Sequence, residues 1–250
     1  MFTHAEIVKL GAVHAVEPMV LSVYLSVPGR SAELRHLPAR ASELITAAEE
    51  AAGPAGRLRA QDRDAVLEKV AAAGRDWLGR TVAVFACADA GLLEAFPLPG
   101  RLQERAVLGV RPHIRPLLVA VQRPEQHVWW LAADQILTAP PDASVAIGLP
   151  ACLAAVDACA VQTLIVPEDG LVPGYECGRC GSLSTAADSC PDWGTAALPV
   201  PDIIEEMVTR ALEDGAQVSV IRGARSPVAA RLRFPLERRP DDAPRHAAHP

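Results

Sequence analysis

The pattern of apolar and polar residues predicts a mixed α/β fold in the first half of the chain. Alternation and short apolar runs predict three strands: residues 21–27, 81–87 and 105–110. The alternation over residues 21–27 is typical of a half-buried strand. Apolar residues at helical spacing predict two helices and a single helical turn ended by prolines: residues 41–52, 62–78 and 92–96.

The middle of the chain predicts a small hairpin. Residues 117–121 and 127–131 are two apolar runs joined by a polar loop of five residues, the pattern of paired strands. Trp129 and Trp130 lie in the second run, and we expect one ring in the core and the other at an interface rather than stacked on bases. An Ala-Pro-Pro-Asp stretch at 139–142 indicates a linker.

The second half predicts a strand–helix–strand unit. Residues 149–160 and 201–214 predict helices, and the second has a capping box at Asp202 and Glu205 and ends at Gly215. The predicted strands are residues 163–166, 217–221 and 228–234. Such a unit implies a parallel strand pair with a crossover helix. We expect the acidic side chains of this helix to face a protein partner: Glu205, Glu206 and Glu213.

Composition limits the classes of function. The chain has 250 residues and a net charge of −6, which argues against a protein that coats DNA or RNA indiscriminately. No apolar run is long enough for a bilayer, no basic region precedes an apolar stretch at the N-terminus, and six cysteines form no regular framework. These features predict a cytoplasmic protein of two domains. The sequence has no GxSxG, P-loop, GxGxxG or HExxH motif, so we expect no enzyme.

Three cysteines form the most informative motif. Cys177-Gly-Arg-Cys180-Gly is a zinc knuckle, and Cys190-Pro-Asp-Trp193-Gly is its partner with tryptophan in place of the fourth thiolate. The ion would be zinc in a degenerate structural site, with Asp192, Asp188, Glu176 or water as fourth ligand. Alternatively the loop is metal-free and Trp193 packs in the place of the metal, or Cys177 and Cys180 form a redox pair. The other cysteines lie in apolar runs and predict core positions: Cys87, Cys152 and Cys159.

Arginines are concentrated near the C-terminus. Residues 222–239 contain six arginines against one glutamate, and only two lysines occur in the chain. Arg222, Arg225, Arg231 and Arg233 predict an RNA phosphate surface, because the guanidinium fork suits phosphate. The alternative is an edge strand protected by charge.

Several segments of the chain resemble the archaeal/eukaryotic-type class-1 peptide release factors and Pelota. Residues 148–153, 162–168, 204–220 and 228–235 resemble their third domain, and residues 20–25 and 111–118 resemble their first. The resemblance implies an N-terminal α+β domain at 1–112 and a remnant of the middle domain at 113–144. It also implies a C-terminal α/β/α sandwich of the kink-turn-binding ribosomal-protein type at 145–236, with the cysteine-knuckle insertion at 168–198. Residues 237–250 predict a disordered tail.

Two departures from this family narrow the expected function. The chain has no Gly-Gly pair and no asparagine, so the Gly-Gly-Gln loop of peptide release and the Asn-Ile-Lys-Ser loop of stop-codon reading are both missing. The resemblance therefore implies a non-catalytic ribosome-associated factor of the hibernation or rescue type, acting under stress. It would contact the ribosome and its RNA, with a translational GTPase as a further candidate partner. Two other hypotheses are a protein-interaction module without ribosome binding and a thiol-redox protein.

Overall fold

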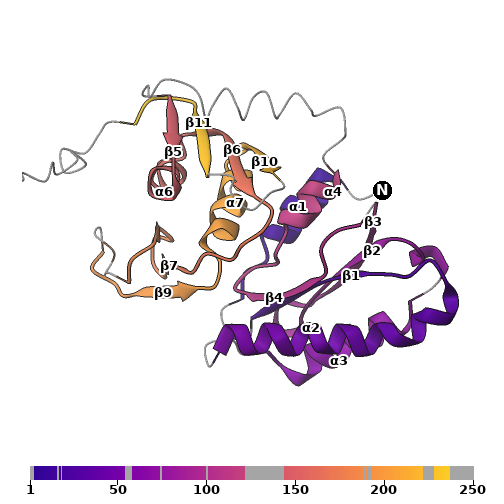
Figure 1. Cartoon of the computed structure of the whole chain (residues 1–250). Helices are drawn as coiled ribbons and strands as arrows, with labels where there is room; N and C mark the ends of the chain where they lie inside the picture. The colour runs from indigo at the N-terminus through magenta and orange to yellow at the C-terminus, as the bar shows by residue number, and fades with distance from the viewer. Residues whose placement is uncertain are drawn as a thin grey trace, which may run out of the picture.

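The computed structural model describes residues 3–15, 17, 19–53, 58–73, 75–99, 101–121, 144–187, 190, 193–221 and 228–236. Within them the chain forms two four-stranded sheets and one three-stranded sheet, with helices packed between and beside them (Figure 1). The predicted α/β class is confirmed. The predicted tail at 237–250 lies outside the described residues.

The N-terminal sheet is antiparallel and has the order β3-β2-β1-β4. Its strands are β1 (Val20–Ser26), β2 (Thr81–Cys87), β3 (Leu92–Leu98) and β4 (Arg105–Gly109). The helical turn predicted at residues 92–96 is wrong, because this segment is the edge strand β3. Pro97 is compatible with β3 because an edge strand has no neighbouring strand on one side. A residue without a backbone N–H therefore loses no inter-strand hydrogen bond there.

Helices α2 (Leu37–Ala52) and α3 (Ala60–Ala71) cover one face of this sheet (Figure 1). Ile45 of α2 and Val66 of α3 are fully buried against the odd-numbered side chains of β1 and the even-numbered ones of β2. The predicted helix at 62–78 ends early, at Ala71, and the short 3₁₀ turn η3 (Arg75–Trp77) follows.

The opposite face of the N-terminal sheet is buried as well, so β1 is not the half-buried strand that its alternation predicts. Ser22 and Tyr24, which read as solvent positions, are 1% and 0% exposed. Phe85 packs beside Tyr24 with an edge-to-face contact of 5.9 Å between ring centroids. The covering elements are α1 (His4–Gly11) and α4 (Arg115–Val121).

Helix α4 replaces the first strand of the predicted hairpin. Leu117 and Leu118 are buried, and Pro116 lies in the first turn of the helix, where its missing N–H would be unpaired anyway. A short apolar run fits a buried helix as well as a strand, which explains the error. The rest of the predicted hairpin, residues 127–131 with Trp129 and Trp130, lies outside the described residues.

The second sheet has the order β10-β6-β11-β5. Its strands are β5 (Val145–Ile147), β6 (Val161–Pro167), β10 (Gln217–Ile221) and β11 (Ala229–Leu232). Strands β6 and β10 are parallel, as the strand–helix–strand pattern predicts, and α7 (Ile203–Glu213) lies between them in sequence. Strand β11 is antiparallel to β6, and its register shifts between Arg231 and Leu232.

Helices α6 (Leu149–Asp157) and α7 pack on the same face of the second sheet. Leu164 and Val166 of β6 contribute to the core beneath these helices, whereas Ile165 belongs to a small cluster on the other face. Among the described residues no helix covers that other face. Two of the three layers of the predicted α/β/α sandwich are therefore described.

The two sheets share one continuous core. Buried residues of both belong to the same hydrophobic cluster, which α1 and α4 complete. Helix α1 approaches α7 closely at Gly11, where a Cβ atom would lie 3.0 Å from Ile114 Cδ1 and 3.5 Å from Thr209 Cγ2. The predicted boundaries at residues 112 and 145 lie on either side of α4, which packs between the two units.

The cysteine insertion forms a small sheet of its own between β6 and α7. It consists of β7 (Gly174–Cys177), β8 (Leu183–Ser184) and β9 (Ala197–Val200), in the order β8-β7-β9. Strand β8 contacts both α6 and α7. None of the helices described here combines the length and apolar character needed to cross a bilayer.

Candidate functional site

The three cysteines of the knuckle motif come together at one end of the small sheet. Cys177 ends β7, Cys180 lies in the turn that follows, and Cys190 lies in a second turn before β9. Their sulfur atoms all lie within 4.8 Å of one another, and Cys180 Sγ is 3.5 Å from Cys190 Sγ. The predicted cluster is confirmed as a grouping of three sulfurs.

Two turns of the same hydrogen-bond pattern carry these cysteines. In the first, Gly181 N donates to Cys177 O at 2.7 Å, and Cys177 N donates to Ser182 O at 2.9 Å. In the second, Gly194 N donates to Cys190 O at 2.7 Å, and Cys190 N donates to Thr195 O at 2.9 Å. Gly181 and Gly194 both have positive φ, 78° and 63°, which favours glycine. The second turn therefore keeps both hydrogen bonds and the positive-φ glycine of the first turn, although Trp193 stands in place of the fourth cysteine.

The environment of Cys177 favours its thiolate. Backbone N–H of Cys180, the Thr195 hydroxyl and backbone N–H of Arg179 lower the pKa of Cys177 to about 6. Hydrogen bonds from Ser182 lower the pKa of Cys180, but burial together with the neighbouring sulfurs of Cys177 and Cys190 outweighs them, and the pKa is raised. Three sulfurs crowded in this way suit a thiophilic cation, which would relieve the repulsion between thiolates.

Trp193 does not fill the centre of the cluster. Its side chain is 51% exposed, and the guanidinium carbon of Arg179 lies 3.9 Å from the ring centroid. The alternative in which Trp193 packs in the place of the metal is therefore wrong. Glu176, a predicted fourth ligand, instead pairs with Arg210 at 2.9 Å and with His14 at 3.7 Å. Asp188 and Asp192 lie outside the described residues.

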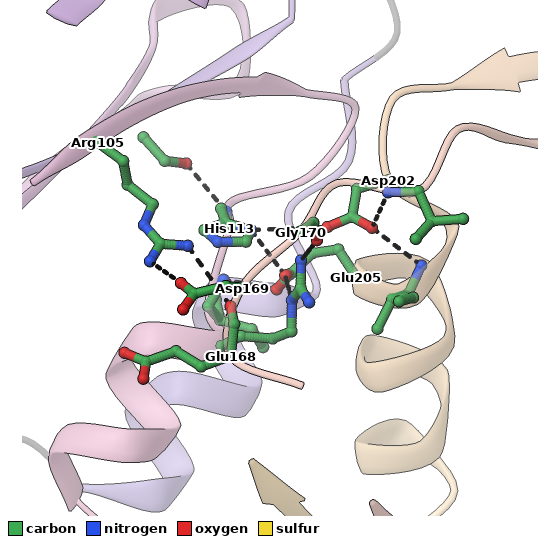
Figure 2. Close-up of polar contacts among 12 residues, drawn as sticks. Arg105, His113, Glu168, Asp169, Gly170, Asp202 and Glu205 are labelled. Carbon is green, nitrogen blue, oxygen red and sulfur yellow. Dashed lines mark hydrogen bonds and ion pairs between the residues drawn. The ribbon is translucent and has the colours of Figure 1, made fainter. Parts of the chain in front are cut away.

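A second polar cluster joins the two halves of the molecule (Figure 2). Its centre is Arg115, the first residue of α4, which is fully buried. The guanidinium group donates to Glu205 Oε2 at 3.0 Å and to Asp202 Oδ2, and it also donates to the carbonyls of Pro167 and Gly170 at 2.9 Å each. The whole fork of Arg115 is thus used to hold the loop after β6 against the start of α7.

The segment before α4 connects this cluster to the N-terminal sheet. Tyr24 Oη donates to His113 O at 2.5 Å, and His113 N donates to Ser22 Oγ at 2.9 Å. On the other side, His113 Nδ1 lies 2.8 Å from Glu205 Oε2, and Ile114 N donates to Glu205 Oε1 at 2.6 Å. Ser22 and Tyr24 of β1 thus anchor the backbone that carries Arg115.

Burial and charge shift the pKa values of these carboxyl groups in different directions. Burial would raise the pKa of Glu205, but the charge and hydrogen bond of His113, the charge of Arg115 and the N–H of Ile114 hold it below its ordinary value. Burial raises the pKa of Asp202, and Arg115 offsets only part of this. His113, Asp202 and Glu205 are close enough to hold a cation, but the Arg115 guanidinium already bonds both carboxylates. We assign this cluster a structural role.

The acidic face predicted for a protein partner is largely internal. Glu205 and Glu206 are 3% and 2% exposed, and Arg111 Nε lies 2.8 Å from Glu206 Oε2. Burial raises the pKa of Glu206 to about 7 despite the opposing charge of Arg111. The predicted capping box is half formed, because Asp202 caps the N–H of Ile204 while Glu205 turns toward the N-terminal unit. Glu213 is the most exposed of the three predicted residues, with 42% of its side chain accessible.

The arginines predicted to bind RNA are described only in part. Arg231 is exposed on β11, on the same side of the strand as Ala229. Arg233 is also exposed, but its Nη2 donates to Asp214 O at 2.8 Å, at the C-terminal end of α7. Arg222 and Arg225 lie outside the described residues, so the predicted phosphate surface stays a prediction.

Two of the three remaining cysteines are in the core, as predicted. Cys87 and Cys152 are fully buried, and burial raises the pKa of Cys152 to about 12. Cys159 is exposed and has a φ of 52°, so its predicted core position is wrong. It lies in the turn after α6, where the apolar pattern of the helix has ended.

Comparisons of the whole chain found no matching family model and no match among curated proteins. Among solved structures, the C-terminal domain of a peptide chain release factor from Methanosarcina mazei is 21% identical, with a TM-score of 0.31; the match covers 48% of this chain and 93% of that one. A structure described only as an archaeal protein is 14% identical over 93% and 97% of the two chains, with a TM-score of 0.28. An archaeal translation termination factor is 13% identical over 93% and 99%, with a TM-score of 0.27. TM-scores of this size do not by themselves establish a common fold.

Proposed function

We propose that this chain is a non-catalytic, ribosome-associated translation factor of the hibernation or rescue type, acting in the cytoplasm. The observation that carries the proposal is the position of the cysteine-knuckle sheet. It lies between a buried strand, β6, and the crossover helix α7, where the release-factor resemblance of the sequence places it. The missing Gly-Gly and asparagine residues favour a role in binding without peptide release or codon reading.

The packing between the N-terminal sheet and the second sheet supports a role in which the protein binds as a rigid body. Arg115, Glu205 and the backbone around His113 are buried where the units meet, and a shared hydrophobic core surrounds them. A protein built in this way would present both units to its target in a fixed arrangement. Occupying a binding site on a large particle requires such a fixed outline more than it requires a hinge.

An arginine-lined hollow on the N-terminal unit offers a surface for RNA. Arg40, Arg80 and Arg101 line a hollow of about 160 Å³ near the end of β1. Arg40 is held by Glu104 and by Ser26 O, whereas Arg80 and Arg101 are exposed. Together with Arg231, these side chains would contact ribosomal RNA phosphates. A translational GTPase is the further partner that the resemblance implies.

Zinc is the ion that we propose for the cysteine cluster. Three cysteine sulfurs are a donor set that Zn²⁺ prefers in structural sites, and backbone N–H groups of the first turn are directed at Cys177 Sγ. Bound zinc would stabilise the small sheet of β7, β8 and β9. Metal analysis of the purified chain tests this directly, and a preparation without bound metal that also takes up no added Zn²⁺ would overturn it.

Sedimentation with purified ribosomes tests the main proposal. The full chain should pellet with ribosomes at low salt and be released as salt is raised. Replacing Arg80 and Arg101 with Gln should reduce the slope of log affinity against log salt by about 2, or about 1 for each phosphate contact. A control with Gln at Arg59 and Lys69, two exposed residues near or within α3, changes the net charge equally and should keep the slope. A wild-type chain that never pellets above the level seen without ribosomes would refute the ribosomal role.

A further inference from the structure

The two knuckle turns differ at one corner of the cysteine cluster. The first turn supplies sulfur from its first and fourth residues, Cys177 and Cys180. The second supplies sulfur from Cys190, but its fourth residue, Trp193, offers no ligand atom, and its half-exposed ring packs on the Arg179 guanidinium. A tetrahedral ion bound by the three sulfurs would need one more donor on the side of the second turn.

The sixth residue of each turn places a hydroxyl group beside the sulfurs. In the first turn, Ser182 Oγ lies 3.3 Å from Cys180 Sγ and 3.7 Å from Cys190 Sγ. In the second turn, Thr195 Oγ1 lies 3.2 Å from Cys177 Sγ. The two turns share the same pair of backbone hydrogen bonds, and Thr195 follows Trp193 at the spacing at which Ser182 follows Cys180. Thr195 Oγ1 is thus the hydroxyl oxygen that the turn without a fourth sulfur places against the cluster.

We infer that the cluster binds Zn²⁺ through three thiolates and one oxygen, and that Thr195 Oγ1 is the oxygen ligand. This inference rests on the zinc proposed above and adds the identity of the fourth donor. On a tetrahedral ion with bond lengths of roughly 2.3 Å to sulfur and roughly 2.1 Å to oxygen, two ligand atoms lie about 3.6 Å apart. The 3.2 Å between Thr195 Oγ1 and Cys177 Sγ therefore has to open by about 0.4 Å when the ion binds. A neutral hydroxyl donates less charge than a thiolate, so the ion should bind more weakly than in a four-cysteine site.

Cobalt and zinc titrations of the metal-free full chain test the ligand set. Co²⁺ reports thiolates through its sulfur charge-transfer band and reports the coordination sphere through its visible bands. The wild-type chain should show a charge-transfer intensity typical of three thiolates. Thr195→Val keeps the shape of the side chain without the hydroxyl, and it should shift the visible bands and weaken Zn²⁺ binding about tenfold or more.

Two variants make the test specific. Trp193→Cys restores the fourth thiolate, so it should raise the charge-transfer intensity by about one third and tighten Zn²⁺ binding at least tenfold, with Trp193→Ala as its control for loss of the ring. Ser182→Ala removes the hydroxyl that lies against Cys180 Sγ in the first turn; it should keep the charge-transfer intensity of three thiolates and shift the visible bands less than Thr195→Val does. Folding of each variant is checked by circular dichroism.

The outcomes separate the two claims. If Thr195→Val matches the wild type in both affinity and spectrum, the oxygen ligand is not Thr195, although zinc binding stands. If the wild type takes up no Co²⁺ or Zn²⁺ while Trp193→Cys does, the zinc proposal itself fails. Ribosome sedimentation of the same preparations is an independent measurement, so a failure there leaves the metal site untouched.

Discussion

Replacing Arg115 with Met should destabilise the protein strongly. The substitution keeps an unbranched apolar side chain in the buried space but removes the cation from between two buried carboxylates, Asp202 and Glu205. It also leaves the carbonyls of Pro167 and Gly170 without their donor. The helix and the two carboxylates remain, so the variant isolates the loss of the guanidinium.

The expected loss is about 3–5 kcal/mol of the free energy of unfolding at neutral pH, because removing one partner of a buried ion pair leaves uncompensated charge in the interior. Domains are commonly stable by only about 5–15 kcal/mol, so this loss is a large part of the total. The loss should be smaller at low pH, where the orphaned carboxyl groups can be protonated. Their pKa values would rise without the arginine, so stability of the variant falls as pH rises.

Urea unfolding followed by circular dichroism measures the effect. The matched control combines Arg115→Met with Asp202→Asn and Glu205→Gln, which replaces the charges by neutral groups of similar shape. This triple variant should recover at least half of the loss, because no unpaired charge remains. A single variant that loses less than about 1 kcal/mol, or a triple variant no more stable than the single one, would refute the assigned role of Arg115.

Three further predictions concern stability. Burial raises the pKa of Glu206 from 4.5 to about 7, so between these pH values the folded protein keeps a proton that the unfolded chain releases. The free energy of unfolding of the wild type, relative to that of Glu206→Gln, should therefore fall by about 3 kcal/mol between pH 4.5 and about 7. A difference between the two proteins that does not change with pH in urea unfolding would contradict this. Gly174→Ala would place Cβ 2.5 Å from Ile203 Cδ1 and should cost about 1–3 kcal/mol in urea unfolding, whereas Gly29→Ala, with open space around it, should be neutral; equal effects would disprove the packing argument. Tyr24→Phe should lose about 1–2 kcal/mol of unfolding free energy, because a buried carbonyl loses its donor, and an unchanged midpoint would show that this hydrogen bond is not needed.

Sequence patterns located most of the fold because its strands are short apolar runs with clear breaks. These patterns did not show whether a strand is buried on one face or on both. Ser22 and Tyr24 gave β1 the pattern of a strand with one solvent-exposed face. Both side chains are instead buried and hydrogen-bond the backbone of His113, some 90 residues away in the sequence. The run at 117–121 failed because all five of its residues are apolar, so it has no polar period that would distinguish a helix from a buried strand.

The cysteine cluster was predictable because its ligands are close in sequence and its turns have a fixed spacing. The ionic cluster was not, because its partners come from opposite halves of the chain. Glu205 and Glu206 read as the wet face of an amphipathic helix, and only the approach of Arg111 and Arg115 makes that face internal. The Arg-Pro-His-Ile-Arg-Pro run at 111–116 contributed to the release-factor resemblance, but it did not reveal that its arginines contact the acidic residues of α7.

The ion pairs between the two halves of the chain restrict which halves can be combined in one folded protein. Arg111 and Arg115 come from one half, and the carboxylates that neutralise them come from α7 in the other. A chimera that fuses the first 144 residues to the second half of a distant homologue would bury cations against unmatched side chains. Recombination between such genes therefore preserves a folded product only where the arginines and their acids are inherited together.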